Sequence, residues 1–571
     1  MDERWLHPFG PHVAGAARLA VAGQHDDGDV SPDRGAEPTH LSGLLWLPWV
    51  DQQHRHQPSV PDHAADHRPC QVIGEPAVHH TTERSGTIAL PDLAALRRQL
   101  SGTVLLPAEP AYQAAVQIDN GRVQLAPRFI VQANSTQDVA LVLQYVRQHG
   151  LRLTVKGGGH SASGYSLNSG GVVLDMSLMT RIQLDAEARV VTVQTGARWH
   201  EVYVHLIDSG TGLIPIGGGC PTVGIAGFMQ GGGYSFVSRS YGLSIDNLLA
   251  LTLVTVDGQV HRLSADSADP AERELFWACR GGGGGNWGVA VEMEVRVHAP
   301  RSDRMLTASL RYAPSQAQEV LGFYNRWVES LPDEMAIYGI WGPSPDPSDP
   351  SRTIQTFGFT AIYNGDFGEG AKLLSPLLEL GPLSASLNRI TLPEFELING
   401  ASTLVAHRSA YIRSGMMPPG AFKPEAIAVF ERFMAVAPSP DSFIVWTHAG
   451  GRIEAIEPNA TAFAHRGARF VPELKAIWDQ PQDARANIEW AHAFFEALEP
   501  FFQGAYVNYI DPLLAGWQAK YYGDHYPRLL EIKRQCDPAG LLAFQQGVGS
   551  RFEPELSQPL NLAPLNRTFA D

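Results

Sequence analysis

The sequence contains few cysteines and no long apolar run. Its 571 residues include four cysteines, which stand far apart and form no CxxC pair. The spacing therefore predicts neither a zinc site nor a disulfide scaffold, and we expect no metal. No stretch approaches the roughly 18 apolar residues that a membrane-spanning helix needs. We expect a protein without a membrane partner.

Basic charge is also scarce. There are 43 lysines and arginines against 59 acidic residues, which gives a formal net charge of −16. No basic cluster is present, so we exclude a nucleic-acid partner. The opening MDERWLHPFG lacks the basic and apolar regions of a signal peptide. Cytoplasmic and secreted locations both stay open, and nothing predicts the oligomeric state.

The first 85 residues differ from the rest. They hold nearly half of the 21 histidines, together with many Pro, Asp and Gly and little periodicity. A metal-binding tail is one interpretation of this composition. A disordered or extraneous leader is the other, and it is the one we expect.

Periodic structure follows from about residue 91. PRFIV is typical of a strand, Ser135 is a helix N-cap with Asp138 three residues later, and Gly150 ends that helix. LRLTV then predicts a second strand that runs into a glycine-rich loop. Further on, ALTLVTVDGQVHRL predicts a hairpin that turns at Asp257 and Gly258.

Three segments are unusually rich in glycine. They are KGGGHSASGYS (156–166), IGGGCPTVGIAGFMQGGGYS (216–235) and RGGGGGNWGVAVEMEVRVH (280–298). Glycine in an ordered segment costs about 0.5–1 kcal/mol relative to alanine, so such runs indicate close approach to the main chain. Phosphate binding is one interpretation and tight turns are the other. GGGNWG matches the dinucleotide motif, but a strand-like segment follows it, which disfavours a Rossmann site.

After residue 300, long amphipathic helices alternate with alternating strands, the pattern of an antiparallel sheet covered by helices. We therefore predict an α+β protein. Residues 86–300 form the first domain, 301–500 a substrate-binding domain, and 501–555 a C-terminal segment that packs back on the first.

Taken together, the motifs are more specific than any one of them. Lys156, Gly158, Gly159, His160 and Ser161 fit R/K-x-G-G-H-S, and GGGCPTVGIAG, GLSIDN, RGGGGGNWG and the C-terminal AYVNYIDP follow in order. The chain resembles the berberine-bridge-enzyme-like FAD-linked oxidases of the vanillyl-alcohol-oxidase superfamily over residues 127–549. This resemblance implies a PCMH-type FAD-binding domain made of two α+β subdomains.

The resemblance also implies how FAD is held. His160 would be bonded to the flavin 8α-methyl carbon and Cys220 to flavin C6, which makes the FAD bicovalent. Imidazole nitrogen and thiolate are suitable nucleophiles for an electron-poor ring. The other residues expected at the cofactor are Lys156, Gly157, Gly158, Gly159, Ser161, Gly219, Val223, Gly224, Gly227, Gly232, Gly233, Tyr234, Gly288, Val289, Asn508 and Gln545.

Hydride removal from an alcohol needs a base for the hydroxyl proton. Tyr506 and Tyr509 match the family's Y-x-N-Y, whose second tyrosine is the usual base. On a strand Tyr506 and Tyr509 would point to opposite faces, so the pattern does not choose between them. A phenol titrates near pH 10, so the base needs neighbours that lower its pKa. Both rings could instead be packing aromatics.

These residues predict an oxidoreductase that takes hydride from a sugar-like or natural-product alcohol and reduces dioxygen to hydrogen peroxide. The small Val223 is compatible with dioxygen access, whereas larger residues there indicate dehydrogenases. Lys156 replaces a frequent arginine, and Phe228 a frequent histidine. The alternatives are a dehydrogenase with another acceptor, or a flavin-carrying binding protein. We expect His465 and Arg466 to be exposed or to bridge domains, and the substrate itself is not predicted.

Overall fold

The computed structural model describes residues 93–400 and 407–550, which all lie in one unit, Trp46–Asp571. The predicted leader, residues 1–85, lies outside the described residues, as do residues 551–555. The described chain contains three sheets. Within these ranges, no helix is both long enough and apolar enough to cross a bilayer.

The first sheet is small and mostly parallel. Its order is β1-β2-β4-β3, and β2, β4 and β3 run parallel. The strands are β1 (Thr103–Leu105), β2 (Phe129–Gln132), β3 (Leu153–Lys156) and β4 (Val172–Asp175), with helices α1 (Leu93–Gln99), α2 (Pro110–Ala115) and α3 (Thr136–Gln148). The predicted strand–helix–strand unit is confirmed as β2, α3 and β3. Ser135 caps α3 by accepting a hydrogen bond from the Asp138 N–H.

The second sheet is antiparallel, in the order β5-β6-β9-β7-β8. Its strands are β5 (Ile182–Asp185), β6 (Val190–Gln194), β7 (Leu248–Val254), β8 (Val260–Ser264) and β9 (Val289–Arg296). The helices in this part are α4 (Trp199–Asp208), α5 (Ile225–Gln230), α6 (Ser238–Tyr241) and α7 (Pro270–Cys279). The predicted hairpin is confirmed as β7 and β8, and Gly258 takes a φ of +86° in its turn.

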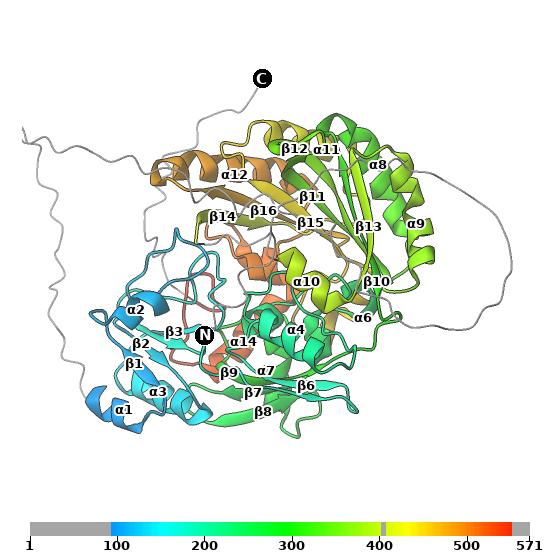
Figure 1. Ribbon diagram of the computed structural model, residues 1–571. Helices are drawn as coiled ribbons and strands as arrows, with labels where there is room; N and C mark the ends of the chain where they lie inside the picture. Colours follow the sequence, from blue (N-terminus) through cyan, green and yellow to red (C-terminus); the bar gives the residue numbers. More distant parts are fainter. Residues whose placement is uncertain (1–92, 401–406, 551–571) are drawn as a thin grey trace, which may run out of the picture. The chain divides into compact units, whose positions relative to one another are not determined.

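The third sheet has seven antiparallel strands in the order β13-β10-β12-β11-β15-β16-β14. They are β10 (Met305–Tyr312), β11 (Met335–Asp346), β12 (Asp349–Tyr363), β13 (Ser384–Ile390), β14 (Ser409–Ser414), β15 (Phe443–His448) and β16 (Phe470–Trp478). Helices α8 (Ala317–Trp327), α9 (Phe367–Glu379), α11 (Pro424–Ala435) and α12 (Ala484–Leu498) cover one face (Figure 1) and form a large apolar core with it. The opposite face, here called the open face, is directed at the glycine loops. The predicted α+β fold is confirmed.

The C-terminal segment returns to the first two sheets. It contains a short 3₁₀ helix, Val507–Tyr509, followed by α13 (Trp517–Tyr522) and α14 (Tyr526–Cys536). Leu542 pairs with Leu153 of β3, and the Lys533 ammonium group donates to the Asn286 carbonyl at 2.7 Å. These contacts support our proposal that residues 501–555 form a segment that packs on domain 86–300.

Candidate active site

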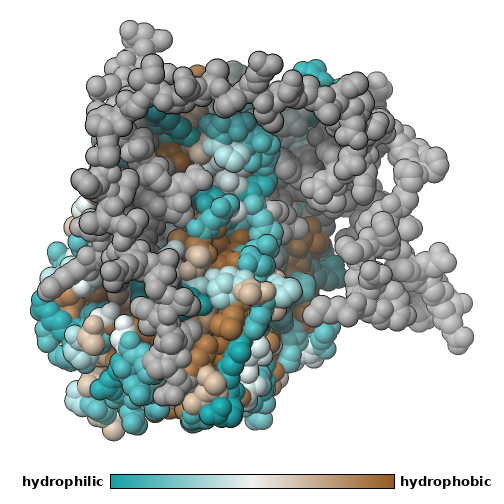
Figure 2. Space-filling model, turned by 90° about the vertical axis from the view of Figure 1, so that its left-hand side faces the viewer, coloured by the Kyte–Doolittle hydropathy of each residue, from teal (hydrophilic) through white to brown (hydrophobic). Residues whose placement is uncertain are grey.

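A cavity of about 450 Å³ lies between the glycine loops and the open face. All three glycine-rich segments contribute to its lining, through residues 157–161, 218–220 and 283–286 among others. The open face contributes side chains of β10, β11, β12, β14, β15 and β16. Figure 2 shows one face of the molecule, on which apolar side chains gather towards the middle and hydrophilic ones lie around them. The glycine loops therefore share one site.

The glycines serve two different purposes. A Cβ on Gly158 would lie 2.2 Å from the Gly224 nitrogen, and one on Gly224 would lie 2.3 Å from the Gly158 nitrogen, so two loops touch backbone to backbone. A Cβ on Gly227 would meet no atom within 4 Å, although Gly227 lines the cavity. Some glycines therefore allow loop packing, and others leave room for a ligand.

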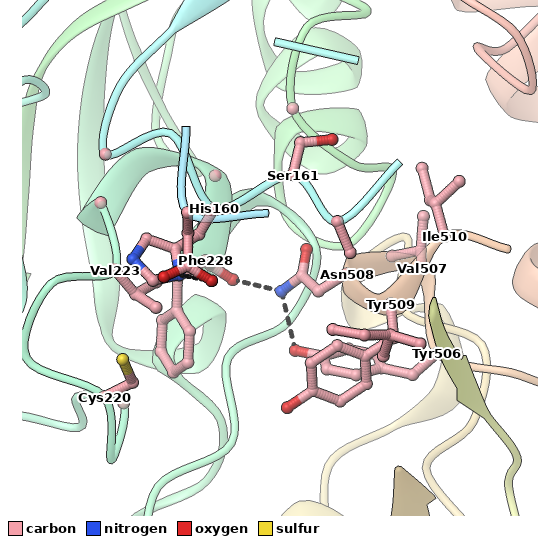
Figure 3. Close-up of a pocket in the computed structure, with 18 of the residues that line it drawn as sticks. His160, Ser161, Cys220, Val223, Phe228, Tyr506, Val507, Asn508, Tyr509 and Ile510 are labelled. Carbon is pink, nitrogen blue, oxygen red and sulfur yellow. Dashed lines mark hydrogen bonds and ion pairs between the residues drawn. The ribbon is translucent and has the colours of Figure 1, made fainter. Parts of the chain in front are cut away.

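His160 and Cys220 face the same small region of the cavity (Figure 3). Both contact the Thr222 hydroxyl oxygen: His160 Nε2 lies 2.8 Å away and Cys220 Sγ 3.5 Å away. Burial lowers the pKa of His160, and the nearby Asp119 opposes that shift without reversing it. The imidazole is thus favoured in its neutral, nucleophilic form.

The two tyrosines lie together, which the strand interpretation did not predict. Residues 507–509 form a 3₁₀ helix, so the alternation of a strand does not apply. The Tyr506 and Tyr509 rings are 5.2 Å apart between centroids, and both line the cavity (Figure 3). The Tyr506 hydroxyl accepts hydrogen bonds from the Gly233 N–H at 2.7 Å and the Asn508 amide at 2.9 Å.

Tyr509 faces a carboxylate. Burial raises the pKa of Tyr509, and the charge of Glu473 together with a hydrogen bond to it raises the pKa further. Glu473 also pairs with Lys475 at 3.3 Å, and both line the cavity from β16. The expected lowering of the base's pKa is therefore not provided by these neighbours. They provide a proton acceptor instead.

Several residues at the cavity were not predicted from sequence. They are Asp119, Arg311, Glu473 and Lys475 in the lining, and Thr222 behind it. Glu473 and Lys475 did leave a signal, because ELK interrupts the apolar strand FVPELKAIW with two charges on one face. Thr222, Asp119 and Arg311 have no comparable pattern around them.

Some predicted cofactor residues do not line the cavity. They are Lys156, Gly232, Gly233, Val289 and Gln545. The Lys156 ammonium group donates to the Ala115 carbonyl, and the Gln545 amide donates to the Pro512 carbonyl. The remaining predicted cofactor residues, Gly159, Ser161, Gly219, Val223, Tyr234, Gly288 and Asn508 among them, do line it.

His465 and Arg466 are buried away from the cavity lining. Arg466 makes a two-pronged ion pair at 2.7 Å with Asp246, which lies between α6 and β7. The His465 Nε2 bonds to the Lys520 carbonyl at 2.8 Å. Both residues join distant segments of the chain, in line with the bridging role that we expected.

The cavity has the properties that a dinucleotide cofactor needs. Its volume lies within the roughly 300–1,000 Å³ of ordinary ligand sites. The Tyr165 hydroxyl and the Ser166 Oγ are buried in its wall and have no hydrogen-bond partner among the residues that the structure describes. Buried polar atoms of this kind are normally satisfied, so they indicate a polar ligand. Open glycine edges can present backbone N–H groups to phosphates.

Fold and cavity fit a flavin-binding oxidoreductase, and comparisons with known proteins identify this class. Residues 127–264 match the model of the FAD binding domain, and residues 505–549 match that of berberine and berberine-like proteins. An uncharacterized FAD-linked oxidoreductase of Bacillus subtilis, YvdP, is 29% identical over 79% of this chain and 98% of its own. The chain thus carries the FAD binding domain and the C-terminal berberine-like domain of the berberine-bridge-enzyme-like FAD-linked oxidoreductases, and it is an oxidoreductase.

Named relatives include sugar oxidases and dehydrogenases. The glucooligosaccharide oxidase of Sarocladium strictum is 26% identical over 73% of this chain and 86% of its own. The structure of Physcomitrella patens BBE-like 1 has a TM-score of 0.72 at 22% identity, covering 81% of this chain and 99% of its own. Phl p 4, a grass pollen allergen with glucose dehydrogenase activity, has a TM-score of 0.67 at 23% identity, covering 78% of this chain and 96% of its own. An isoleucine-to-valine variant of Phl p 4 is described as a glucose oxidase.

Proposed function

We propose that this enzyme oxidises an alcohol carbon of a sugar or oligosaccharide, using FAD attached through both His160 and Cys220, and that dioxygen is its electron acceptor. The observation that carries the proposal is the hydrogen-bonded pair of Tyr509 and Glu473, which lies in the same cavity as the two nucleophiles. Relatives named as oligosaccharide-oxidising enzymes support the substrate class.

Tyr509 and Glu473 move the hydroxyl proton. When bound, FAD accepts the hydride and passes the electrons on. Tyr509 accepts the proton of the substrate hydroxyl while its own proton moves to Glu473, so no free phenolate is required. The Lys475 ammonium group lies 3.3 Å from the Glu473 carboxylate and balances its negative charge before the proton arrives. Because Tyr509 does not become a free phenolate in this relay, its raised pKa does not prevent the proton transfer.

Tyr506 is the second candidate for the base. Two donors, the Gly233 N–H and the Asn508 amide, are directed at its oxygen and would stabilise a phenolate. Burial nevertheless keeps the pKa of Tyr506 above its ordinary value. Asn508 also donates to the Phe228 carbonyl at 2.8 Å, which holds the C-terminal segment against the second glycine loop (Figure 3).

Val223 supports dioxygen as the acceptor. It lines the cavity beside Cys220 and is small. The oxidase described for the isoleucine-to-valine variant of Phl p 4 links valine to oxidase behaviour in that protein. The alternative is a dehydrogenase that passes electrons to another acceptor.

Peroxide release tests this function. The purified enzyme is offered oligosaccharides, simple alcohols and polycyclic glycosides, and hydrogen peroxide is measured. We expect peroxide with at least one oligosaccharide, and we expect the substrate-bleached flavin to regain its colour promptly in air. Bleaching without recolouring would identify a dehydrogenase, and no bleaching with any sugar would contradict the substrate class.

A further inference from the structure

Thr222 contacts both proposed attachment residues through one hydroxyl group. His160 and Cys220 belong to different glycine loops, yet His160 Nε2 and Cys220 Sγ lie 2.8 and 3.5 Å from the same Thr222 Oγ1. Thr222 does not line the cavity, whereas His160 and Cys220 do. Its hydroxyl therefore serves the two side chains from behind and leaves their cavity sides clear.

A hydroxyl group has one proton to donate and lone pairs to accept with. Thr222 therefore cannot donate to His160 and Cys220 at the same time. If the thiol donates to Oγ1, then Oγ1 donates to the imidazole. Moving each proton one place along this line leaves a thiolate that accepts from Thr222 and an imidazolium that donates to it. The geometry thus connects the thiol to a base that it does not touch.

Charged neighbours act on both ends of this line. Asp119 favours the imidazolium, whereas burial and Lys475 favour the neutral imidazole, so the imidazole holds the extra proton only in passing. Asp119 Oδ2 lies 3.7 Å from His160 Nδ1, on the other side of the ring, where it stabilises a positive imidazole. Lys475 lines the cavity from β16, on the open face. Although burial acts to lower it, the pKa of Lys475 is held above its ordinary value by Glu473, Cys220 and Asp119.

We propose that Thr222 prepares Cys220 and His160 for flavin attachment in two ways: it carries the thiol proton to the imidazole when Cys220 bonds the flavin, and it holds the neutral imidazole through Nε2 when His160 does. The proposal rests on the bicovalent attachment put forward above. Nε2 is held by Thr222, so Nδ1 is the atom left to bond the flavin.

The attachment chemistry balances with dioxygen as the oxidant. At Cys220 a C–S bond forms at a ring carbon, the thiol proton and the ring hydrogen leave, and two electrons stay on the flavin. At His160 a C–N bond forms at a methyl carbon. The imidazole proton and one methyl hydrogen leave as protons, and two electrons again stay on the flavin. Dioxygen takes each electron pair and two protons as hydrogen peroxide. Thr222 itself is unchanged.

The test compares three variants of the full chain with the wild type. Thr222→Val keeps the volume without the hydroxyl, Thr222→Ala removes both, and Thr222→Ser keeps the hydroxyl. Each protein is digested after acid precipitation, and the flavin-bearing fraction of the peptides around residues 160 and 220 is measured by mass spectrometry. Total FAD and the Tm of each variant are recorded. We expect the Cys220-linked fraction to fall about ten- to a hundredfold in the Val and Ala variants, the effect of one hydrogen bond to a charged group, and to stay near wild type in the Ser variant.

The outcomes separate this inference from the function on which it rests. Unmodified peptides in the wild type overturn both. Modified wild-type peptides with equal modification in the Val and Ala variants overturn the role of Thr222 alone. Loss in the Ser variant as well, or loss that accompanies unfolding in both hydroxyl-free variants, also counts against it. Loss in the two folded hydroxyl-free variants with rescue by serine supports it.

Discussion

The two walls of the cavity are built in different ways. The glycine-loop wall presents mostly backbone, and its close contacts, such as that between Gly158 and Gly224, involve main-chain atoms. The open face presents side chains, with Arg311, Glu473, Lys475 and Tyr338 among the polar ones. A backbone wall suits a cofactor that related enzymes share. A side-chain wall can change with the substrate while the fold persists.

Removing the proposed proton relay should show most clearly that the two walls have different roles. Tyr509→Phe deletes only a hydroxyl on the substrate side, so we expect FAD content to stay at the wild-type level. The rate of flavin reduction by an accepted sugar should fall by about 10²–10⁴-fold, the usual value of positioned acid–base catalysis. Stopped-flow absorbance measures this rate. Tyr506→Phe is the matched control, and a larger loss there would make Tyr506 the base.

On the glycine-loop wall, substitutions should affect cofactor and fold rather than turnover. Gly224→Ala places a Cβ 2.3 Å from the Gly158 nitrogen, and we expect a loss of about 1–3 kcal/mol or more in unfolding free energy. Gly227→Ala meets no protein atom within 4 Å, so it should keep that stability and lose bound FAD instead. Urea unfolding and flavin absorbance measure the two effects. Equal destabilisation by both changes would show that the glycines do not have separate purposes.

A substitution at Val223 tests whether this residue controls the access of dioxygen to the reduced flavin. Val223→Ile adds one carbon beside Cys220, so we expect air reoxidation of the reduced flavin to slow by about tenfold, or ~1.4 kcal/mol in barrier. Flavin reduction by substrate should change little, because Tyr509 and Glu473 are untouched. Double-mixing stopped-flow resolves the two half-reactions. An unchanged reoxidation rate would remove Val223 as the basis for proposing an oxidase.

Glu396 on α10 (Leu392–Gly400) does not belong to either wall of the cavity. Its side chain is fully buried near Tyr203 of α4 and Tyr338 of β11, and its oxygens have no hydrogen-bond partner in the described part of the chain. Burial raises the pKa of Glu396 well above its ordinary 4.5, so the folded protein keeps this proton to higher pH than the unfolded chain does.

The raised pKa makes stability depend on pH. The wild type loses stability as the pH rises above about 4.5, because the unfolded carboxyl ionises first. Glu396→Leu removes this loss, and we expect a gain of about 1 kcal/mol at pH 7.5 that shrinks towards pH 4.5. Denaturant unfolding at the two pH values measures it. A gain that is the same at both would contradict the buried, protonated carboxyl.

The sequence predicted the glycine-loop wall better than the open face. The strands, the Ser135 cap and the glycine loops depend on local signals, so β2, α3 and β3 were found from periodicity and capping alone. The pairing of Tyr509 with Glu473 depends on a contact between the C-terminal segment and β16, which no local pattern reports. The alternation of a strand does not apply to Tyr506 and Tyr509, because the 3₁₀ helix Val507–Tyr509 brings both rings together. Thr222 was missed since its significance lies in distances between loops.

The proposed chemistry depends on one flavin bonded to both His160 and Cys220. Digestion of the purified holoenzyme followed by mass spectrometry tests it directly. We expect one conjugate whose mass equals the two peptides plus FAD, less the hydrogens lost in forming the two bonds. Two unmodified peptides, with the flavin released by acid, would contradict it.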